Sequence, residues 1–314
     1  MTKTVVIALG GNALISDETH QSVPDQYRAA ERICRHMVPL LRDPHLRLVV
    51  THGNGPQVGF ILRRSELAAA SMHQVPLDSC VADTQGALGY QLERALRNEM
   101  RRQGVVKSPA ALVTLALVDK DDPAFHHPTK PIGSFLSKER AEEHRRKDGW
   151  DLVEEAGRGW RRVVASPLPK AILDVDAVRS LLDAGFVVIA AGGGGIAVVQ
   201  EANGDLFGAS AVVDKDLASS LLARQLDAEV LIITTGVEKV CLHYEKPGQK
   251  ALDVITVAEA KHYMAAGHFM PGSMLPKVQA VIEFLEGGGR QAVITDPEHL
   301  VAALQGRGGT RVIP

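Results

Sequence analysis

The sequence lacks the features that mark several common protein classes. It has three cysteines, Cys34, Cys80 and Cys241, which lie far apart and form no C-x-x-C pair. An odd number of isolated cysteines fits reduced thiols in the cytosol better than a disulfide framework or a zinc site. No apolar run approaches the roughly 20 residues that a membrane helix requires. We therefore expect a cytoplasmic protein that has no protein-bound metal and no membrane partner.

Net charge is also almost absent. Lys and Arg number 35 against 37 Asp and Glu, which gives a formal charge of −2. A nearly neutral chain has no global field to attract nucleic acid, so we expect no nucleic-acid partner. With 45% hydrophobic and 23% charged residues, the composition is that of an ordinary folded protein.

Familiar catalytic motifs are missing as well. The run GNGPQVG (residues 53–59) is one residue too long for the dinucleotide motif G-x-G-x-x-G, and no G-x-x-x-x-G-K-[ST] occurs. The sequence also has no G-x-S-x-G elbow and no H-E-x-x-H pair. These absences argue against a P-loop enzyme, a typical NAD enzyme, a serine hydrolase and a zinc hydrolase.

What is present is a regular alternation of apolar runs and helical patterns. Most of the apolar runs do not alternate with polar residues, which is typical of strands covered on both faces. Pro56, Pro271 and Pro297 stand where proline is tolerated at the first position of a helix. The pattern predicts an α/β protein, a three-layer αβα sandwich around a mainly parallel open sheet. The predicted strands are residues 4–9, 46–51, 111–117, 186–191, 230–235 and 291–295, with a possible edge strand at 310–313, and the predicted helices are 25–41, 56–70, 79–103, 175–184, 212–226, 256–266 and 271–285.

A charged insertion interrupts this alternation between residues 121 and 165. It holds nine Lys or Arg and nine Asp or Glu residues, so it is not a basic nucleic-acid arm. Pro128 and Pro131 bracket Lys130 on what should be a stiff loop. The residues leave two interpretations open, a solvated excursion between core strands or a lid that brings Lys130 to an active site.

Glycine-rich turns follow four of the predicted strands, at residues 9–12, 52–59, 191–199 and 234–239. Glycine there lets backbone N–H groups approach an anion, and a following helix N-terminus adds a favourable dipole. Open α/β sheets bind ligands at this edge. The turns therefore predict an anion site.

Three lysines occur beside glycine or proline loops. They are Lys130, Lys215 (between Asp214 and Asp216) and Lys277, which follows Pro271 in a predicted helix. Phosphoryl transfer requires cations and N–H donors around a transition state whose charge is spread over oxygens. The lysines and the glycine turns together favour a phosphotransferase.

Several segments resemble the carbamate kinases, which belong to the amino-acid kinase superfamily. The similarity runs in order through nearly the whole chain, and its most specific pieces are HGNGPQVG, PTKPIG, DKDLAS and FMPGSMLPK. Further segments that take part are VVIALGGNAL, PLDSCVADTQGALGY, EEAGRGWRRVVASP, GGGGIAVV and LIITTGVEKV.

The resemblance implies reversible phosphoryl transfer between carbamoyl phosphate and ADP, which yields ATP and carbamate. It also implies a homodimer, with Mg²⁺ bridging nucleotide phosphates largely through water. Each subunit would be one domain of residues 1–314, with a carbamate lobe at about 1–205 and a nucleotide lobe at about 206–314. The charged insertion at about 121–165 would be a small protruding subdomain over the cleft, so the resemblance favours the lid.

The resemblance also assigns roles to individual positions. Lys130 would reach the transferred phosphoryl group, Lys215 and Lys277 would hold nucleotide phosphates, and Asp214 would orient the lysines. Loop residues expected to bind the phosphoryl and carbamate groups are Gly10, Gly11, Asn12, Gly53, Asn54, Gly193 and Gly194. Residues expected to form the adenine slot are Tyr244, Met270, Pro271 and Met274.

Two alternatives remain at this point. Another amino-acid kinase, with acetylglutamate or uridylate as acceptor, is disfavoured because such relatives place a lysine shortly before the first glycine pair. This sequence has Ala8 there and would draw the missing cation from Lys130. A non-catalytic nucleotide sensor would be expected to lack one of the three lysines, and all three are present.

Overall fold

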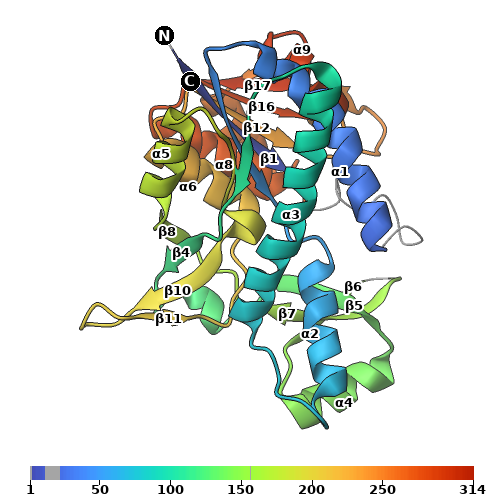
Figure 1. Cartoon of the computed structure of the whole chain (residues 1–314). Coiled ribbons are helices and arrows are strands. Elements are labelled where there is room, and N and C mark those ends of the chain that lie inside the picture. Colours follow the sequence, from blue (N-terminus) through green and yellow to red (C-terminus); the bar gives the residue numbers. More distant parts are fainter. Residues whose placement is uncertain (1, 11–21, 156) are drawn as a thin grey trace.

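A mainly parallel sheet forms the centre of the computed structural model, which describes residues 2–10, 22–155 and 157–314 (Figure 1). Neighbouring strands pair in parallel except for β17 with β16, so β17 and its neighbour β15 run opposite to the other strands. The 310–313 strand is therefore present but is not at the edge, because β15 pairs with its outer side. The strand order is β15 (Val254–Thr256), β17 (Thr310–Ile313), β16 (Gln291–Thr295), β12 (Val230–Thr234), β1 (Lys3–Leu9), β2 (Leu46–His52), β9 (Val187–Ile189) and β3 (Pro109–Ala111).

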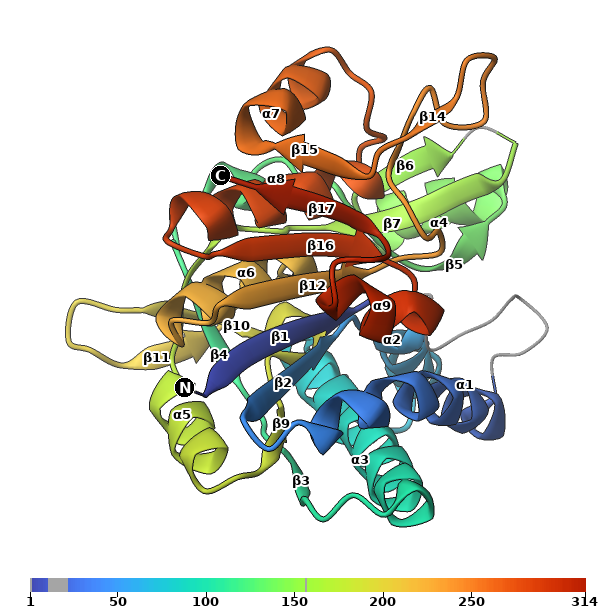
Figure 2. The same ribbon diagram turned by 90° about the horizontal axis from the view of Figure 1, so that it is seen from above.

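Helices cover both faces of this sheet, as the view from above shows (Figure 2). In β1, Val5 and Ile7 pack into one helical layer while Val6 and Ala8 pack into the other, and all four are fully buried. This is why the apolar run of β1 has no polar alternation, and it confirms the predicted αβα sandwich. One layer contains α1 (Val23–Met37), α3 (Leu77–Gln103) and α9 (Leu300–Leu304), and the other contains α5 (Val175–Asp183), α6 (Lys215–Gln225) and α8 (Met274–Glu286), with α7 (Val257–Ala265) beside α8.

A second sheet accounts for one wrong strand prediction. The predicted strand 111–117 is two strands, because the chain leaves the main sheet after Ala111 and enters the second sheet at Leu115. At the crossing, the Gln85 side chain replaces a strand partner: its Oε1 accepts from Thr114 N at 2.8 Å, and its Nε2 donates to Thr114 O at 3.1 Å. The second sheet contains β11 (Leu206–Gly208), β10 (Ile196–Gln200), β4 (Leu115–Val118) and β8 (Pro169–Ile172).

The charged insertion folds into a small sheet of its own that protrudes beside α2 (Gln57–Ala68) (Figure 1). The predicted protruding subdomain is therefore present. Its apolar residue Ile132 packs on Val58 of α2, and Arg162 forms an ion pair of 2.9 Å with Glu66 of α2. Its elements are β5 (Lys130–Leu136), α4 (Lys138–Asp148), β6 (Leu152–Glu155) and β7 (Gly159–Val164), in the sheet order β5-β7-β6.

Two helix starts differ from the prediction for local reasons. Helix α6 begins at Lys215 and not at residue 212, because the Asp214 side chain caps it by accepting from the N–H groups of Asp216 and Leu217. Helix α8 begins at Met274 and not at Pro271, because Gly272 has a φ of +71°, which a right-handed helix cannot contain. No helix in the described part of the chain is long and apolar enough to cross a membrane.

Candidate active site

The carboxyl ends of four parallel strands meet at one cavity of about 660 Å³. Gly10 follows β1, Gly53 follows β2, Thr235 follows β12 and Asp296 follows β16, and all four line the cavity. This edge is where open α/β sheets bind ligands, because loops and helix N-termini converge there. The glycine turns therefore stand where the sequence predicted an anion site.

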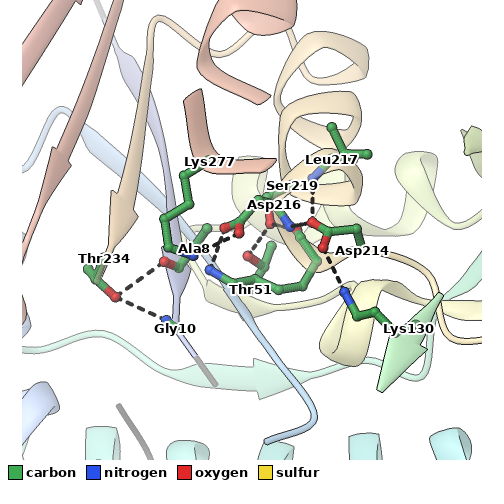
Figure 3. Close-up of polar contacts among 11 residues, drawn as sticks. Ala8, Gly10, Thr51, Lys130, Asp214, Asp216, Leu217, Ser219, Thr234 and Lys277 are labelled. Carbon is green, nitrogen blue, oxygen red and sulfur yellow. Dashed lines mark hydrogen bonds and ion pairs between the residues drawn. The ribbon is translucent and has the colours of Figure 1, made fainter. Parts of the chain in front are cut away.

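Three lysines reach this cavity from three separate elements. Lys130 begins β5 of the subdomain, Lys215 begins α6, and Lys277 lies in the first turn of α8. Figure 3 shows Asp214 and Asp216 between Lys130 and Lys277. The structure thus brings together residues that lie far apart in the sequence, and it places three cations at the edge of one cavity.

Asp216 joins two of these lysines. Its Oδ1 lies 2.5 Å from Lys215 Nζ and its Oδ2 lies 2.9 Å from Lys277 Nζ, while its side chain is only 4% exposed. A buried carboxylate between two ammonium groups reduces their mutual repulsion and holds both at one spacing. The resemblance assigned no role to Asp216. The signal was the alternation Asp-Lys-Asp, which places a carboxylate on each side of Lys215.

Asp214 holds the third lysine. Its Oδ2 accepts a hydrogen bond of 2.7 Å from Lys130 Nζ, and its Oδ1 caps helix α6. Burial alone would raise the pKa of Asp214, but the charge and hydrogen bond of Lys130, with the N–H of Asp216, lower it to about 2. Asp214 therefore stays ionised at neutral pH. The task predicted for Asp214 alone is divided, with Asp214 contacting Lys130 and Asp216 contacting the other two lysines.

Lys215 is buried, and its surroundings shift its pKa. Burial and the neighbouring charge of Lys277 lower its pKa to about 8, although Asp216 and Asp214 act in the opposite direction. Apart from its ion pair with Asp216, Lys215 Nζ has no hydrogen-bond acceptor among the described residues. An ammonium group with unused donors at the cavity suits an anionic ligand.

The loop after β2 contributes an unpaired amide. Asn54 is 7% exposed and lines the cavity, and neither its Oδ1 nor its Nδ2 has a partner in the described part of the chain. A buried amide without partners costs stability unless a ligand or water completes it. Gly193 packs directly against it, since a Cβ there would lie 2.0 Å from Asn54 Oδ1.

Two of the predicted loop residues, Gly10 and Gly194, differ in how they lie relative to the cavity. Gly10 lines the cavity, but its N–H donates to Thr234 Oγ1 at 3.1 Å. Gly194 does not line the cavity, because it packs against the backbone of Val213, where a Cβ would lie 2.5 Å from the carbonyl oxygen. Gly11 and Asn12 lie outside the described residues.

The four residues predicted for the adenine slot are not brought to the cavity. Tyr244 and Met270 are 45% and 66% exposed, Pro271 is exposed, and Met274 is half-buried. The nearest residues in the chain that do line the cavity are Gly272, Ser273 and Pro276. The assignment of these four residues to the adenine slot stays a prediction from the resemblance.

Buried polar side chains form hydrogen bonds to the backbone of the turns after β9 and β2. Gln85 donates through Nε2 to Gly192 O at 2.9 Å, and this bond ties the glycine-rich turn after β9 to α3. His52 donates through Nδ1 to Gly53 O at 3.2 Å. Burial lowers the pKa of His52 to about 4, so the ring is neutral and adds no further positive charge beside Lys215.

The residues present fit a magnesium ion that arrives with its ligand. Among the described residues, no group of three or more His, Cys, Asp or Glu side chains is placed to hold a metal ion. Asp214 and Asp216 are already engaged by lysines. Magnesium commonly keeps several waters and binds through substrate phosphates, and this donor set suits that mode better than a cage of protein ligands.

The fold and the lysine-lined site define a phosphotransferase, and comparison with known proteins identifies the family. Residues 3–296 match the model of the amino acid kinase family, and the chain belongs to that family.

Individual relatives are similar over almost their full length. The chain is 50% identical to the carbamate kinase-like protein YahI of Escherichia coli K12, with 100% of this chain and 99% of that protein covered. It is 44% identical to the carbamate kinase of Thermococcus kodakarensis, with 99% of each covered. The structure of a Giardia lamblia carbamate kinase bound to AMP-PNP has a TM-score of 0.92 at 39% identity, over 99% of this chain and 98% of that one.

Proposed function

We propose that this protein is a carbamate kinase that reversibly transfers a phosphoryl group between carbamoyl phosphate and ADP, giving ATP and carbamate. The observation that carries the proposal is the convergence of Lys130, Lys215 and Lys277, with the half-buried Asp214 and the buried Asp216, on one cavity at the carboxyl edge of the sheet. The carbamate kinase names of relatives at 44% identity and the AMP-PNP in a structural relative support the acceptor and the nucleotide.

In this proposal the chain acts by positioning and by charge. Lys215 and Lys277 hold the nucleotide phosphates and the transferring group, and Lys130 approaches that group from the subdomain. Positive charges fixed before the reaction stabilise the charge that develops on the transferring oxygens without reorganisation. Transfer is direct and in line, because the carboxylates of Asp214 and Asp216 are engaged by lysines and are poor nucleophiles. Mg²⁺, carried on the nucleotide phosphates, would neutralise part of their charge.

Carbamate as acceptor agrees with the surroundings of Lys130. Ala8, where relatives that use acetylglutamate have a lysine nearby, is fully buried in β1 and offers no cation. Lys130, at the start of β5 in the subdomain, lines the cavity and provides a cation there. Carbamate has no side chain to recognise, and the unpaired Asn54 amide with the adjoining loop backbone provides polar groups of suitable size.

The lobe division and the homodimer are parts of the same proposal. Gly53, Asn54 and Gly193 come from the part before about residue 205, and Lys215 and Lys277 come from the part after it, which supports a carbamate lobe followed by a nucleotide lobe. The homodimer rests on the resemblance to carbamate kinases. Light scattering on the purified protein should give the mass of two chains, and the mass of one chain would remove the dimer.

The test of the function is ATP formation from carbamoyl phosphate, ADP and Mg²⁺. Wild type should form ATP rapidly, Lys130→Ala should lose roughly 10²-fold or more in kcat, and Lys170→Ala should not change it. Lys170 is a suitable control because it forms an exposed lysine–aspartate pair with Asp119. No ATP from folded wild-type protein would refute the carbamate acceptor and redirect the assay to acetylglutamate and uridylate. Labelled protein after incubation with labelled ATP alone would contradict direct transfer.

A further inference from the structure

Helix α2 and strand β5 meet through two glycines. Gly59 is the third residue of α2 and is buried, and a Cβ built on it would lie 2.3 Å from Gly133 Cα and 2.4 Å from Gly133 N. The opposing atoms are backbone, so a methyl group could be fitted only if one of the two elements moved. Gly133 has a φ of +72° and lies where the pairing of β5 with β7 shifts register.

Each of these elements carries part of the proposed site. Strand β5 begins with Lys130, three residues before Gly133. Helix α2 follows directly on the loop that contains Gly53 and Asn54, which line the cavity. The contact between the two glycines therefore joins the acceptor loop to the lysine that approaches from the subdomain.

Strand β5 does not belong to the main sheet, so the contacts of the subdomain with neighbouring elements, α2 among them, place Lys130 relative to the cavity. The subdomain rests on α2, and Figure 1 shows the helix alongside the small sheet. Val58 and Ile132, each next to one of the glycines, are 2% and 4% exposed and belong to one apolar cluster. A cluster this closely packed transmits a displacement of α2 to β5.

We infer that Gly59 is a positioning residue for phosphoryl transfer: the absence of a side chain lets β5 approach α2 closely enough to hold Lys130 at the cavity. The inference rests on the proposed function of Lys130. The direction of the effect follows from geometry, since a methyl group at residue 59 pushes β5 away and moves Lys130 relative to Asp214 and the transferring group. A misplacement of about 1 Å at a reacting centre can cost about 10²-fold in rate.

The test compares Gly59→Ala with Gly86→Ala. Gly86 also lies inside a helix, α3, and is exposed, and a Cβ there would meet no atom within 4 Å. Both substitutions gain helix propensity to a similar extent, so the difference between them isolates the contact with Gly133. We expect Gly59→Ala to lower kcat for ATP formation about 10- to 100-fold while KM for ADP changes little, and Gly86→Ala to leave both unchanged.

A double-mutant cycle distinguishes positioning from general damage. If Gly59 acts through Lys130, Gly59→Ala should cost less than about twofold in a Lys130→Ala background. An equal loss of kcat in both backgrounds, or a loss no larger than that of Gly86→Ala, would overturn the inference. Wild-type activity that collapses in Lys130→Ala keeps the proposed function intact in either case, so the two failures are separable.

Ile132→Val keeps the inference testable if Gly59→Ala fails to fold. It removes one methylene from the same joint, a change that cores usually tolerate. We expect a smaller loss of kcat that likewise disappears in the Lys130→Ala background. A loss that persists there would count against the positioning role.

Discussion

Replacing Asp216 by asparagine removes the carboxylate that holds two lysines while keeping the shape of the side chain. The Asp216 side chain is 4% exposed and contacts Lys215 at 2.5 Å and Lys277 at 2.9 Å. Breaking a buried ion pair by removing one partner costs about 3–5 kcal/mol, because an uncompensated charge is left behind. In the Asp216→Asn variant the two ammonium groups would face each other without that carboxylate.

The response of the variant that costs the least free energy is the loss of a proton from Lys215. Its pKa of about 8 already includes the favourable charge of Asp216. At pH 7 the wild-type group is only about one pH unit from deprotonation, which corresponds to about 1.4 kcal/mol. Because the expected penalty exceeds that amount, Lys215 should be mainly neutral at pH 7 in the variant. A neutral amine no longer stabilises the transferring group, so we expect kcat to fall about 10²–10³-fold.

The pH dependence gives the sharper readout. ATP formation would be measured from about pH 6 to pH 9 for the wild type, Asp216→Asn and the control Asp253→Asn. Asp253 also pairs with a lysine, Lys239 at 2.6 Å, but is 77% exposed. The variant should recover activity as pH falls and Lys215 regains its proton, while the control follows the wild type. A kcat within about fivefold of wild type, or an alkaline limb that stays near pH 8, would show that Asp216 does not keep Lys215 protonated.

Further predictions concern Lys215 and the support beneath the glycine-rich turn. Lys215→Ala should lower kcat by roughly 10²–10³-fold with an unchanged circular dichroism spectrum; an unchanged kcat would remove Lys215 from the mechanism. In the wild type, kcat/KM for ADP should decline above a pH of about 8, because Lys215 loses its positive charge as pH rises through its lowered pKa. Lys215→Arg, which stays charged, should lack that decline. Gln85→Leu removes three buried hydrogen bonds to Thr114 and Gly192 and should lower the free energy of unfolding by about 2–4 kcal/mol in urea denaturation; a loss below about 1 kcal/mol would show that water replaces these bonds.

Much of the fold can be predicted from the sequence, because strands and helices depend on the local pattern of apolar and polar residues. The fully apolar run of β1 predicts a strand covered on both faces, and Val5 and Val6 indeed enter opposite helical layers. The predicted strand at 111–117 is wrong for a reason that no local pattern contains. Its break depends on Gln85, which lies 29 residues before Thr114 and bonds its backbone.

In the candidate site, too, local sequence identifies the lysines but not their partners. Glycine and proline neighbours single out Lys130, Lys215 and Lys277, but not the carboxylate that each one contacts. Asp214 and Lys130 lie 84 positions apart, and Asp216 and Lys277 lie 61 apart. The sequence does not distinguish the two aspartates that flank Lys215. The start of α6 gives them different roles, because Asp214 caps the helix and Asp216 is buried within it.

The αβα class, the glycine turns at the strand ends, the three lysines and the likeness to carbamate kinases can all be predicted from local patterns and ordered motifs. Three features become visible only in the folded chain: the pairing of lysines with aspartates, the placement of Tyr244 and Met270 outside the cavity, and the contact of Gly59 with Gly133. The two groups of features differ in the sequence separation of the residues that interact. Backbone conformation follows from neighbours within a few residues, whereas a charge pair or a close backbone contact between distant segments exists only once whole layers have packed.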